Sequence, residues 1–183
     1  MAATPEDLFR RLDALGIRHT THRHPPLHTV AQSVMLRGSL PGGHCKSLFL
    51  KDRKDGLWLV VVLEERRLDL KALADRLGAP RFSFGSAALL QDVLGVTPGS
   101  VTPFALINDA SQRVRVVLDR DMLALDPLNY HPLVNTATTA IAAADLQRFI
   151  AACGHRPAIV ALADIDRAEN RGGACQDPPP PPC

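Results

Sequence analysis

Two apolar runs separated by a short charged turn constrain the fold of this chain more than any other feature. Residues 48–50 read Leu-Phe-Leu and residues 57–63 are continuously apolar, while the turn between them ends in Asp55-Gly56. An Asp-Gly pair between apolar runs is a strong hairpin signal, because these residues accept the positive φ that a tight turn requires. The sequence therefore predicts two antiparallel strands of a sheet.

Helical spacing and capping residues predict helices on both sides of this hairpin. A helix over about residues 5–15 has Thr4 as its N-cap, Pro5 at its first position and Gly16 after its end. Leucines at helical spacing and a closing glycine predict another helix over residues 69–77. By the same signals we expect helices over residues 29–37, 86–94 and 144–153.

Further short apolar segments predict additional strands, over residues 17–23, 81–84, 104–107, 114–118 and 133–141. Asn108-Asp109 lies between the third and fourth of these, which predicts a second hairpin. Helices that alternate with hairpins indicate a mixed α/β chain of the α+β kind. We expect a mixed or antiparallel sheet with helices packed on it.

The composition predicts one globular domain and a tail. A chain of 183 residues with 46% hydrophobic residues can bury one substantial core. From residue 164 the sequence becomes charged and glycine-containing, and it ends in a run of prolines that cannot bury enough apolar surface to order itself. We therefore expect a domain over residues 1–163 and a disordered tail over residues 164–183.

Charge and cysteine content suggest a cytoplasmic protein. The net charge of +2 allows a nucleic-acid partner without requiring one. The four cysteines form no CxxC pair and the N-terminus lacks a signal-peptide pattern, which favours free thiols in a reducing compartment. The longest apolar run, residues 57–63, is far shorter than the roughly 20 residues of a membrane span.

Lys46 is the leading candidate for a functional residue. It lies between a glycine-rich turn and an apolar run. A lysine at a strand start often only protects a sheet edge, which is the structural interpretation. However, Gly42 and Gly43 permit close approach of a ligand. A partly desolvated lysine can hold a phosphate or a developing oxyanion.

Two other segments carry candidate groups. Residues 97–103 read Thr-Pro-Gly-Ser-Val-Thr-Pro, which is either a simple connector or a backbone nest for a carbonyl or carboxylate. His131 precedes Pro132 and is therefore held extended, so it can serve as a positioned hydrogen-bonding group, although a lone histidine is more often structural.

Other catalytic arrangements find less support. A metal site is conceivable from four histidines near the N-terminus, which are His19, His22, His24 and His28. No cysteine or carboxylate joins them nearby, so we expect neither a metal nor another cofactor. Cys45 is a conceivable nucleophile with His44 or His131 as its base, but we rank this arrangement low, because adjacent side chains on an extended chain point apart. No Ser-His-Asp order, P-loop or dinucleotide fingerprint is present.

Three segments together resemble the YbaK/prolyl-tRNA synthetase editing-domain family, and within it the free-standing ProX branch. They are residues 43–51 (Gly-His-Cys-Lys-Ser-Leu-Phe-Leu-Lys), the turn over residues 99–103 (Gly-Ser-Val-Thr-Pro) and the segment over residues 129–139, which begins Asn-Tyr-His-Pro-Leu. The resemblance covers about residues 4–160. It implies a six- or seven-stranded, barrel-like mixed sheet surrounded by helices.

The resemblance also implies an activity, trans-editing of alanine mischarged onto tRNA(Pro) by hydrolysis of the aminoacyl ester. The implied catalytic groups are Lys46, Gly99 and Ser100. The expected contacts of the aminoacyl-adenosine are His131, Val30, Thr102, Pro103, Asn135 and Thr136. From the basic residues near the first hairpin we expect tRNA contacts at Lys51, Arg53, Lys54, Arg81 and Tyr130.

Alternatives remain open at this point. The substrate could be cysteinyl- or seryl-tRNA, since the sequence does not reveal the volume of the pocket. The chain could also be a non-catalytic module that binds aminoacyl-tRNA. The expected partner is the acceptor stem of mischarged tRNA(Pro), with transient contacts to prolyl-tRNA synthetase or an elongation factor. The acidic residues interleaved with the hairpin cations fit an ordinary solvated surface equally well.

Overall fold

The structure is a computed structural model that describes residues 1–26, 40–163 and 165. Its helices are α1 (Pro5–Ala14), α3 (Leu70–Leu77), α4 (Ala87–Leu94) and α5 (Ala143–Ala152), with 3-10 segments η1 (Pro103–Asn108) and η2 (Met122–Ala124). Its strands are β1 (His19–Arg23), β2 (Gly43–Asp52), β3 (Leu57–Leu63), β4 (Phe82–Phe84), β5 (Val114–Asp119), β6 (Leu128–Tyr130), β7 (Ala137–Ile141) and β8 (Ala158–Val160).

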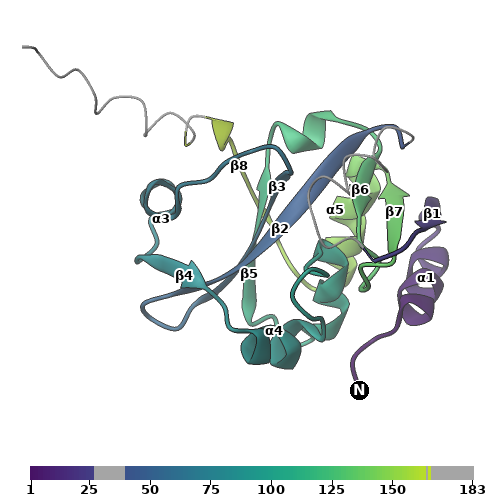
Figure 1. Cartoon of the computed structure of the whole chain (residues 1–183), viewed down its shortest axis with the longest axis horizontal. Coiled ribbons are helices and arrows are strands. Elements are labelled where there is room, and N and C mark those ends of the chain that lie inside the picture. Colours follow the sequence, from purple (N-terminus) through teal and green to yellow (C-terminus); the bar gives the residue numbers. More distant parts are fainter. Residues whose placement is uncertain (27–39, 164, 166–183) are drawn as a thin grey trace, which may run out of the picture.

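The eight strands in the described part of the chain form one mixed sheet, in the order β1-β7-β6-β2-β3-β5-β8 with β4 paired to β2. β2 and β6, β3 and β5, and β5 and β8 pair in parallel, and the other pairs are antiparallel. The mixed α/β class is therefore confirmed, with eight strands where six or seven were expected. Figure 1 shows the long β2 crossing the middle of the sheet.

The predicted hairpin is formed by β2 and β3. Their register runs from Cys45 opposite Leu63 to Lys51 opposite Leu57. Asp55 has a φ of 62°, as a tight turn requires. Asp52 stabilises the turn, because its carboxylate accepts hydrogen bonds from the Lys54 and Gly56 amides at 2.8 and 2.9 Å.

Strand β3 is buried on both faces and separates two hydrophobic clusters. Leu57, Leu59 and Val61 belong to the first core, which also contains side chains of α1, α4 and α5. Trp58, Val60 and Val62 belong to the second core, beneath α3. A strand covered on both sides reads as a continuous apolar run, which explains the sequence of residues 57–63. We call the sheet face toward the second core the second face.

Local capping signals correctly predicted the helix ends. Thr4 and Asp7 form a capping box at the start of α1. Asp69 and Ser86 cap α3 and α4 through their side chains, and Gly78 and Gly95 end these helices in the left-handed conformation. No helix among the described residues has the length and apolar character needed to cross a membrane.

Several predicted strands are wrong. Residues 104–107 lie in η1, because Pro103 favours a helical start and the Thr102 side chain caps it by accepting from the Phe104 amide at 3.3 Å. The second hairpin is therefore absent from the described residues, and β5 instead pairs in parallel with β3. The predicted strand over residues 133–141 contracts to β7, while β6 and β8 were not predicted.

Three predictions fall wholly or partly on positions outside the described residues. The helix over residues 29–37 and Val30 lie there, as does the proposed tail at residues 164 and 166–183. Ile165, which we assigned to the tail, is instead buried in the second core. Its amide donates to the Leu162 carbonyl at 3.3 Å.

The glycine turn before β2 packs against the chain itself. Gly42 has a φ of 95°, and a Cβ built there would lie 2.0 Å from the Pro127 carbonyl oxygen. The Gly43 amide donates to the same oxygen at 2.8 Å, and the Asn129 side chain donates to the Pro41 carbonyl at 2.9 Å. The close approach that Gly42 permits is thus to Pro127 rather than to a ligand.

Substitution of Gly42 by alanine should destabilise the protein more than substitution of Gly16. Both glycines have positive φ, which costs an alanine about 1–2 kcal/mol. Only Gly42 adds a clash, since nothing lies within 4 Å of a Cβ at Gly16. We expect Gly42→Ala to lower the free energy of unfolding by about 2 kcal/mol more than Gly16→Ala. Urea denaturation measures both values, and equal losses would contradict the packing argument.

Candidate functional site

Lys46 lies in β2 opposite Val62 of β3, on the second face of the sheet. The side chain is half-buried, and its Nζ donates a hydrogen bond to the main-chain carbonyl of Arg66. Lys46 is therefore a positioned cation within the sheet rather than a lysine at a strand start.

The residue that accepts from Lys46 is itself firmly held. Arg66 forms ion pairs from Nε to Asp119 and from its terminal nitrogen to Asp121, both at 3.0 Å. Asp119 is fully buried, so the Arg66 charge offsets the cost of burying that carboxylate. The loop after β3 is thus fixed, and the Lys46 ammonium has a defined position.

Strand register brings His131 and Glu64 to the same region as Lys46. In the parallel pair of β2 and β6, His44 lies opposite Asn129, and His131 directly follows β6, so the chain leaves β6 toward the part of β2 that carries Lys46. Glu64 follows Val62 by two residues and so shares its face. Its negative charge acts on the His131 ring. We call Lys46, Glu64, His131 and His24 the Lys46 cluster.

His131 presents a hydrogen-bond acceptor. Its Nδ1 lies 2.9 Å from the Ala137 carbonyl, which can only accept, so Nδ1 carries the proton and Nε2 of the neutral ring is an acceptor. Desolvation lowers the pKa of His131 below its ordinary value, and the nearby His24 acts in the same direction. Ala137 and Glu64 oppose the shift. The ring is therefore neutral at pH 7.

His24, which directly follows β1, packs next to His131 and contacts β7. The two rings lie 6.2 Å apart between centroids. Nδ1 of His24 is 2.9 Å from the Pro25 carbonyl, and Nε2 is 3.0 Å from Thr138 Oγ1, so both ring nitrogens are engaged. The described residues contain no group of three or more His, Cys, Asp or Glu side chains placed to hold a metal ion.

Cys45 and Tyr130 pack into the first core, on the opposite face of the sheet. Burial raises the pKa of the Cys45 thiol to about 12, so it is not a thiolate at neutral pH. The Tyr130 ring is only 3% exposed, and its hydroxyl donates to Met122 Sδ at 3.3 Å. The prediction that Tyr130 stacks on tRNA is therefore wrong, because its ring is enclosed in the core.

The segment over residues 97–103 is a rigid turn in which Gly99 is exposed to solvent. Pro98 and a Gly99 φ of 88° give a type II turn, closed by a 3.0 Å bond from the Ser100 amide to the Thr97 carbonyl. The Ser100 amide is thus not available to a ligand, which corrects that part of the prediction. Gly99 is exposed, and nothing lies within 4 Å of a Cβ built on it.

The same turn packs toward the first core, through Val101 and Phe104. The Thr102 and Pro103 side chains are buried and serve the start of η1. This turn therefore packs on the sheet face opposite to Lys46. Between β6 and β7, Asn135 is half-buried and Thr136 is exposed, with the Thr136 carbonyl accepting from the His24 amide at 2.9 Å.

The predicted tRNA-binding cations gather at the far end of β2. Lys51, Arg53 and Arg81 line a pocket of about 420 Å³, and Lys54 is adjacent in the turn. Lys51 forms an ion pair with Asp55 at 2.7 Å. Lys51 follows Lys46 by five residues, which is about 16 Å along a strand, so these cations are not beside Lys46.

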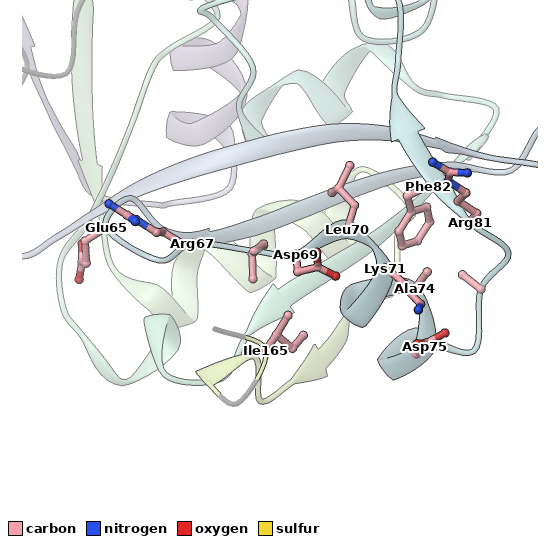
Figure 2. A pocket seen from close by; sticks show the side chains of 12 residues that line it. Glu65, Arg67, Asp69, Leu70, Lys71, Ala74, Asp75, Arg81, Phe82 and Ile165 are labelled. Atoms are coloured by element: carbon pink, nitrogen blue, oxygen red, sulfur yellow. The ribbon is translucent and has the colours of Figure 1, made fainter. Parts of the chain in front are cut away.

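A larger cavity of about 1410 Å³ lies beside α3 (Figure 2). Glu65 and Arg67 lie at one end of this cavity, and Arg81 lies at the other. Three acidic and three basic side chains line it, so its charge is balanced and does not favour a polyanion. Its lining residues are Glu65, Arg67, Leu68, Asp69, Leu70, Lys71, Ala74, Asp75, Ala79, Arg81, Phe82 and Ile165.

Sequence reasoning missed two contacts of this region. Neither the Arg66 carbonyl that accepts from Lys46 nor the Glu64 charge that acts on His131 was predicted. Glu64 was within reach of prediction, because strand alternation from Val62 puts it on the Lys46 face. The Arg66 contact was not, since it depends on how the loop after β3 turns back over the sheet.

Comparison with known proteins identifies the family. The profile described as "Aminoacyl-tRNA editing domain" matches residues 24–149, which is more than half of the chain and includes the whole Lys46 cluster. This chain belongs to the aminoacyl-tRNA editing domain family. The resemblance noted in the sequence is thereby confirmed. The family comprises editing deacylases, and their partner is mischarged tRNA.

Individual proteins that are similar in sequence to this editing-domain protein support the family assignment. It is 38% identical over 167 residues to "Prolyl-tRNA synthetase associated domain-containing protein 1" of Danio rerio, covering 88% of this chain and 91% of that protein. It is 34% identical over 149 residues to "Prolyl-tRNA editing protein ProX" of Acetoanaerobium sticklandii, covering 81% and 91% of the two chains.

Solved structures share the fold. A candidate trans-editing enzyme for prolyl-tRNA synthetase superposes with a TM-score of 0.66 at 18% identity, covering 88% of this chain and 98% of that one. The hypothetical protein APE2540 also gives a TM-score of 0.66, at 22% identity, and covers 84% and 97% of the two chains.

The pKa of His131 provides a direct test of the cluster. An NMR titration of its ring protons should give a midpoint below the ordinary value of about 6.5. Glu64→Gln should lower the midpoint further, because the Glu64 charge stabilises the protonated ring. Asp145→Asn, on α5, is the control and should leave it unchanged. A midpoint that rises in Glu64→Gln would contradict the proposed arrangement.

Proposed function

We propose that this editing-domain protein is a trans-editing deacylase that hydrolyses the ester of alanine mischarged onto tRNA(Pro). The observation that carries the proposal is the held Lys46 ammonium on one sheet face with the neutral His131 ring. The names of the relatives, a prolyl-tRNA editing protein and prolyl-tRNA synthetase associated proteins, support the choice of tRNA(Pro).

Alanine is a reasonable substrate on energetic grounds. A synthetase pocket built for proline cannot strongly reject a smaller side chain, because a missing apolar contact changes binding by only about 1–3 kcal/mol. A second site that accepts small side chains and excludes proline removes the resulting errors. Alanine brings no side-chain nucleophile, so its ester must be cleaved by water.

In the proposed mechanism, water attacks the ester carbonyl carbon, and the ribose oxygen leaves to give free alanine and tRNA. The Lys46 ammonium stabilises the negative charge that develops on the carbonyl oxygen. Nε2 of His131 accepts a hydrogen bond from the α-ammonium group of the substrate and so orients the ester. The ribose 2′-hydroxyl assists proton transfer to the leaving oxygen.

Some of the other predicted substrate contacts are kept in this proposal and one is removed. Gly99 is exposed, but its turn packs toward the first core, on the sheet face opposite to Lys46, so it stays in the proposal only as a contact of the tRNA away from the reacting ester. The Ser100 amide leaves it, since that amide is committed to the Thr97 carbonyl. Asn135 and Thr136 remain candidates for contact with the aminoacyl group, because they lie between β6 and β7 near His131.

Deacylation assays test this function. Wild-type protein should release alanine from alanyl-tRNA(Pro) faster than it cleaves cysteinyl-, seryl- or prolyl-tRNA(Pro) or alanyl-tRNA(Ala). Loss of one charge-stabilising donor typically costs a factor of about 100–1000, and we expect that loss in Lys46→Ala and Lys46→Met. Lys71→Ala is the control, because this exposed lysine lies on α3 outside the cluster.

Three other results of the deacylation assays would change the proposal. Full activity of Lys46→Ala would overturn the mechanism. Lys46-dependent cleavage of cysteinyl- or seryl-tRNA(Pro) in preference to alanyl-tRNA(Pro) would keep the deacylase and change the substrate. Failure to cleave any ester while still binding aminoacyl-tRNA would favour the non-catalytic module.

Recognition of the tRNA body is assigned to the cations of the β2–β3 turn. A site that senses only alanine would also destroy alanyl-tRNA(Ala), so part of the selectivity must come from the acceptor stem. Lys51, Arg53 and Arg81 share one pocket, where they can contact phosphates.

A triple Lys51→Gln, Arg53→Gln and Lys54→Gln variant should bind tRNA more weakly and with a shallower salt dependence. The slope of log affinity against log salt falls by about 0.9 for each duplex phosphate contact that is lost. Filter binding with uncharged tRNA measures this without relying on catalysis. Arg10→Gln, on α1, is the matched control. Unchanged affinity and slope would remove the turn from the interface.

A further inference from the structure

A second basic pocket lies outside all the residues assigned above. It has a volume of about 380 Å³ and is found where β3, β5 and the segment before β8 meet. Its lining residues, all in the described part of the chain, include no aspartate or glutamate; they are Trp58, Gln112, Val114, Arg115, Val116, Val117, Gly154, His155, Arg156 and Ala158. Such a pocket favours an anion.

Two arginines line this pocket, Arg115 of β5 and Arg156 just before β8. β5 and β8 are parallel with Val117 opposite Ala158, and each arginine precedes the member of this pair in its own segment by two residues. Both arginines are exposed. Like charges close to one another repel, and an anion bound between the two guanidinium groups would replace this repulsion by attraction.

Arg115 is already oriented for such a contact. Its guanidinium lies over the Trp58 ring, 5.0 Å from the ring centroid. The ring is held in turn, because Trp58 Nε1 donates to Asp52 at 3.0 Å. The cation–π contact restrains the guanidinium, whose N–H groups can donate hydrogen bonds to a phosphate at the pocket.

The backbone on both sides of the pocket is held by hydrogen bonds. Asp109 accepts from the Arg113 and Val114 amides at 3.0 and 2.9 Å, which fixes the start of β5 next to Arg115. The amide of the buried His155, which precedes Arg156, donates to the Ile150 carbonyl at 3.2 Å. Both segments therefore have a defined position before any ligand arrives.

We propose that Arg115 and Arg156 bind the phosphate backbone of the acceptor-stem duplex of tRNA. The inference rests on the proposed function for its ligand. Trp58 and Arg115 lie opposite one another in register, and Trp58 belongs to the second core. Arg115 therefore lies on the same sheet face as Lys46.

The two basic pockets lie at the same end of the sheet. Asp52 lines the first pocket and its hydrogen-bond partner Trp58 lines the second. From Arg81 to Arg156 the sheet crosses β4, β2, β3, β5 and the segment before β8, which are four spacings of about 5 Å. Cations spread over roughly 20 Å match several steps of a duplex rather than one phosphate. The single-stranded 3′ end would then run along β2 to Lys46.

The test uses tRNA binding and the only tryptophan of the chain. We expect the double variant Arg115→Gln, Arg156→Gln to bind uncharged tRNA(Pro) about tenfold more weakly at 100 mM salt, with a salt slope reduced by about 1–2. Trp58 fluorescence should change when tRNA is added to wild-type protein and should stay constant in the variant. Arg10→Gln is the control, and thermal unfolding of each variant verifies the fold.

A deacylation assay with a substrate that lacks the duplex tests the proposed function independently of this inference. Alanine release from the alanyl ester of a short CCA oligonucleotide, which has no duplex, should differ by less than twofold between wild type and the double variant. Unchanged tRNA affinity and salt slope in the variant would overturn the inference even if wild type deacylates. Arginine-dependent binding without any deacylation would instead uphold the phosphate site and overturn the proposed function. A wild type that binds no tRNA would overturn the inference.

Discussion

The pairing of β2 with β3 is the interaction on which the rest of the structure depends. β3 is buried on both faces, so it fixes the two hydrophobic cores and the orientation of β2. β2 is the longest strand, and its other edge receives β6 at one end and β4 at the other. Lys46 lies near the β6 end and Lys51 near the β4 end. A single strand thus links the cluster proposed for chemistry to the cations proposed for tRNA.

Three buried carboxylates convert this sheet into a set of positioned cations. Asp52 closes the hairpin turn and holds Trp58, and Trp58 supports Arg115. Asp109 fixes the start of β5 beside the second basic pocket. Asp119 pairs with Arg66, whose carbonyl accepts from Lys46. A buried carboxylate is costly unless it is paired or hydrogen-bonded, so each one strongly favours a single loop conformation.

Elements with local signals were predicted well, and elements that depend on distant partners were not. The hairpin and the ends of α1, α3 and α4 follow from caps, turn residues and alternation within a few positions. β8 has no such signal, because only its parallel pairing with β5 makes it a strand. Residues 104–107 resembled a strand by composition, but Thr102 and Pro103 start a 3-10 helix there.

The sequence by itself determined the family and the central hairpin, because both reside in contiguous motifs, and it made Lys46 the leading candidate for the site. The tertiary structure decided which side of the sheet each side chain occupies. It enclosed Tyr130 in the core and brought Glu64 close enough to His131 for its charge to act on the ring. It also brought Arg115 and Arg156 to the lining of one pocket. These outcomes depend on register between strands far apart in the chain, and the packing of both cores sets that register as a whole.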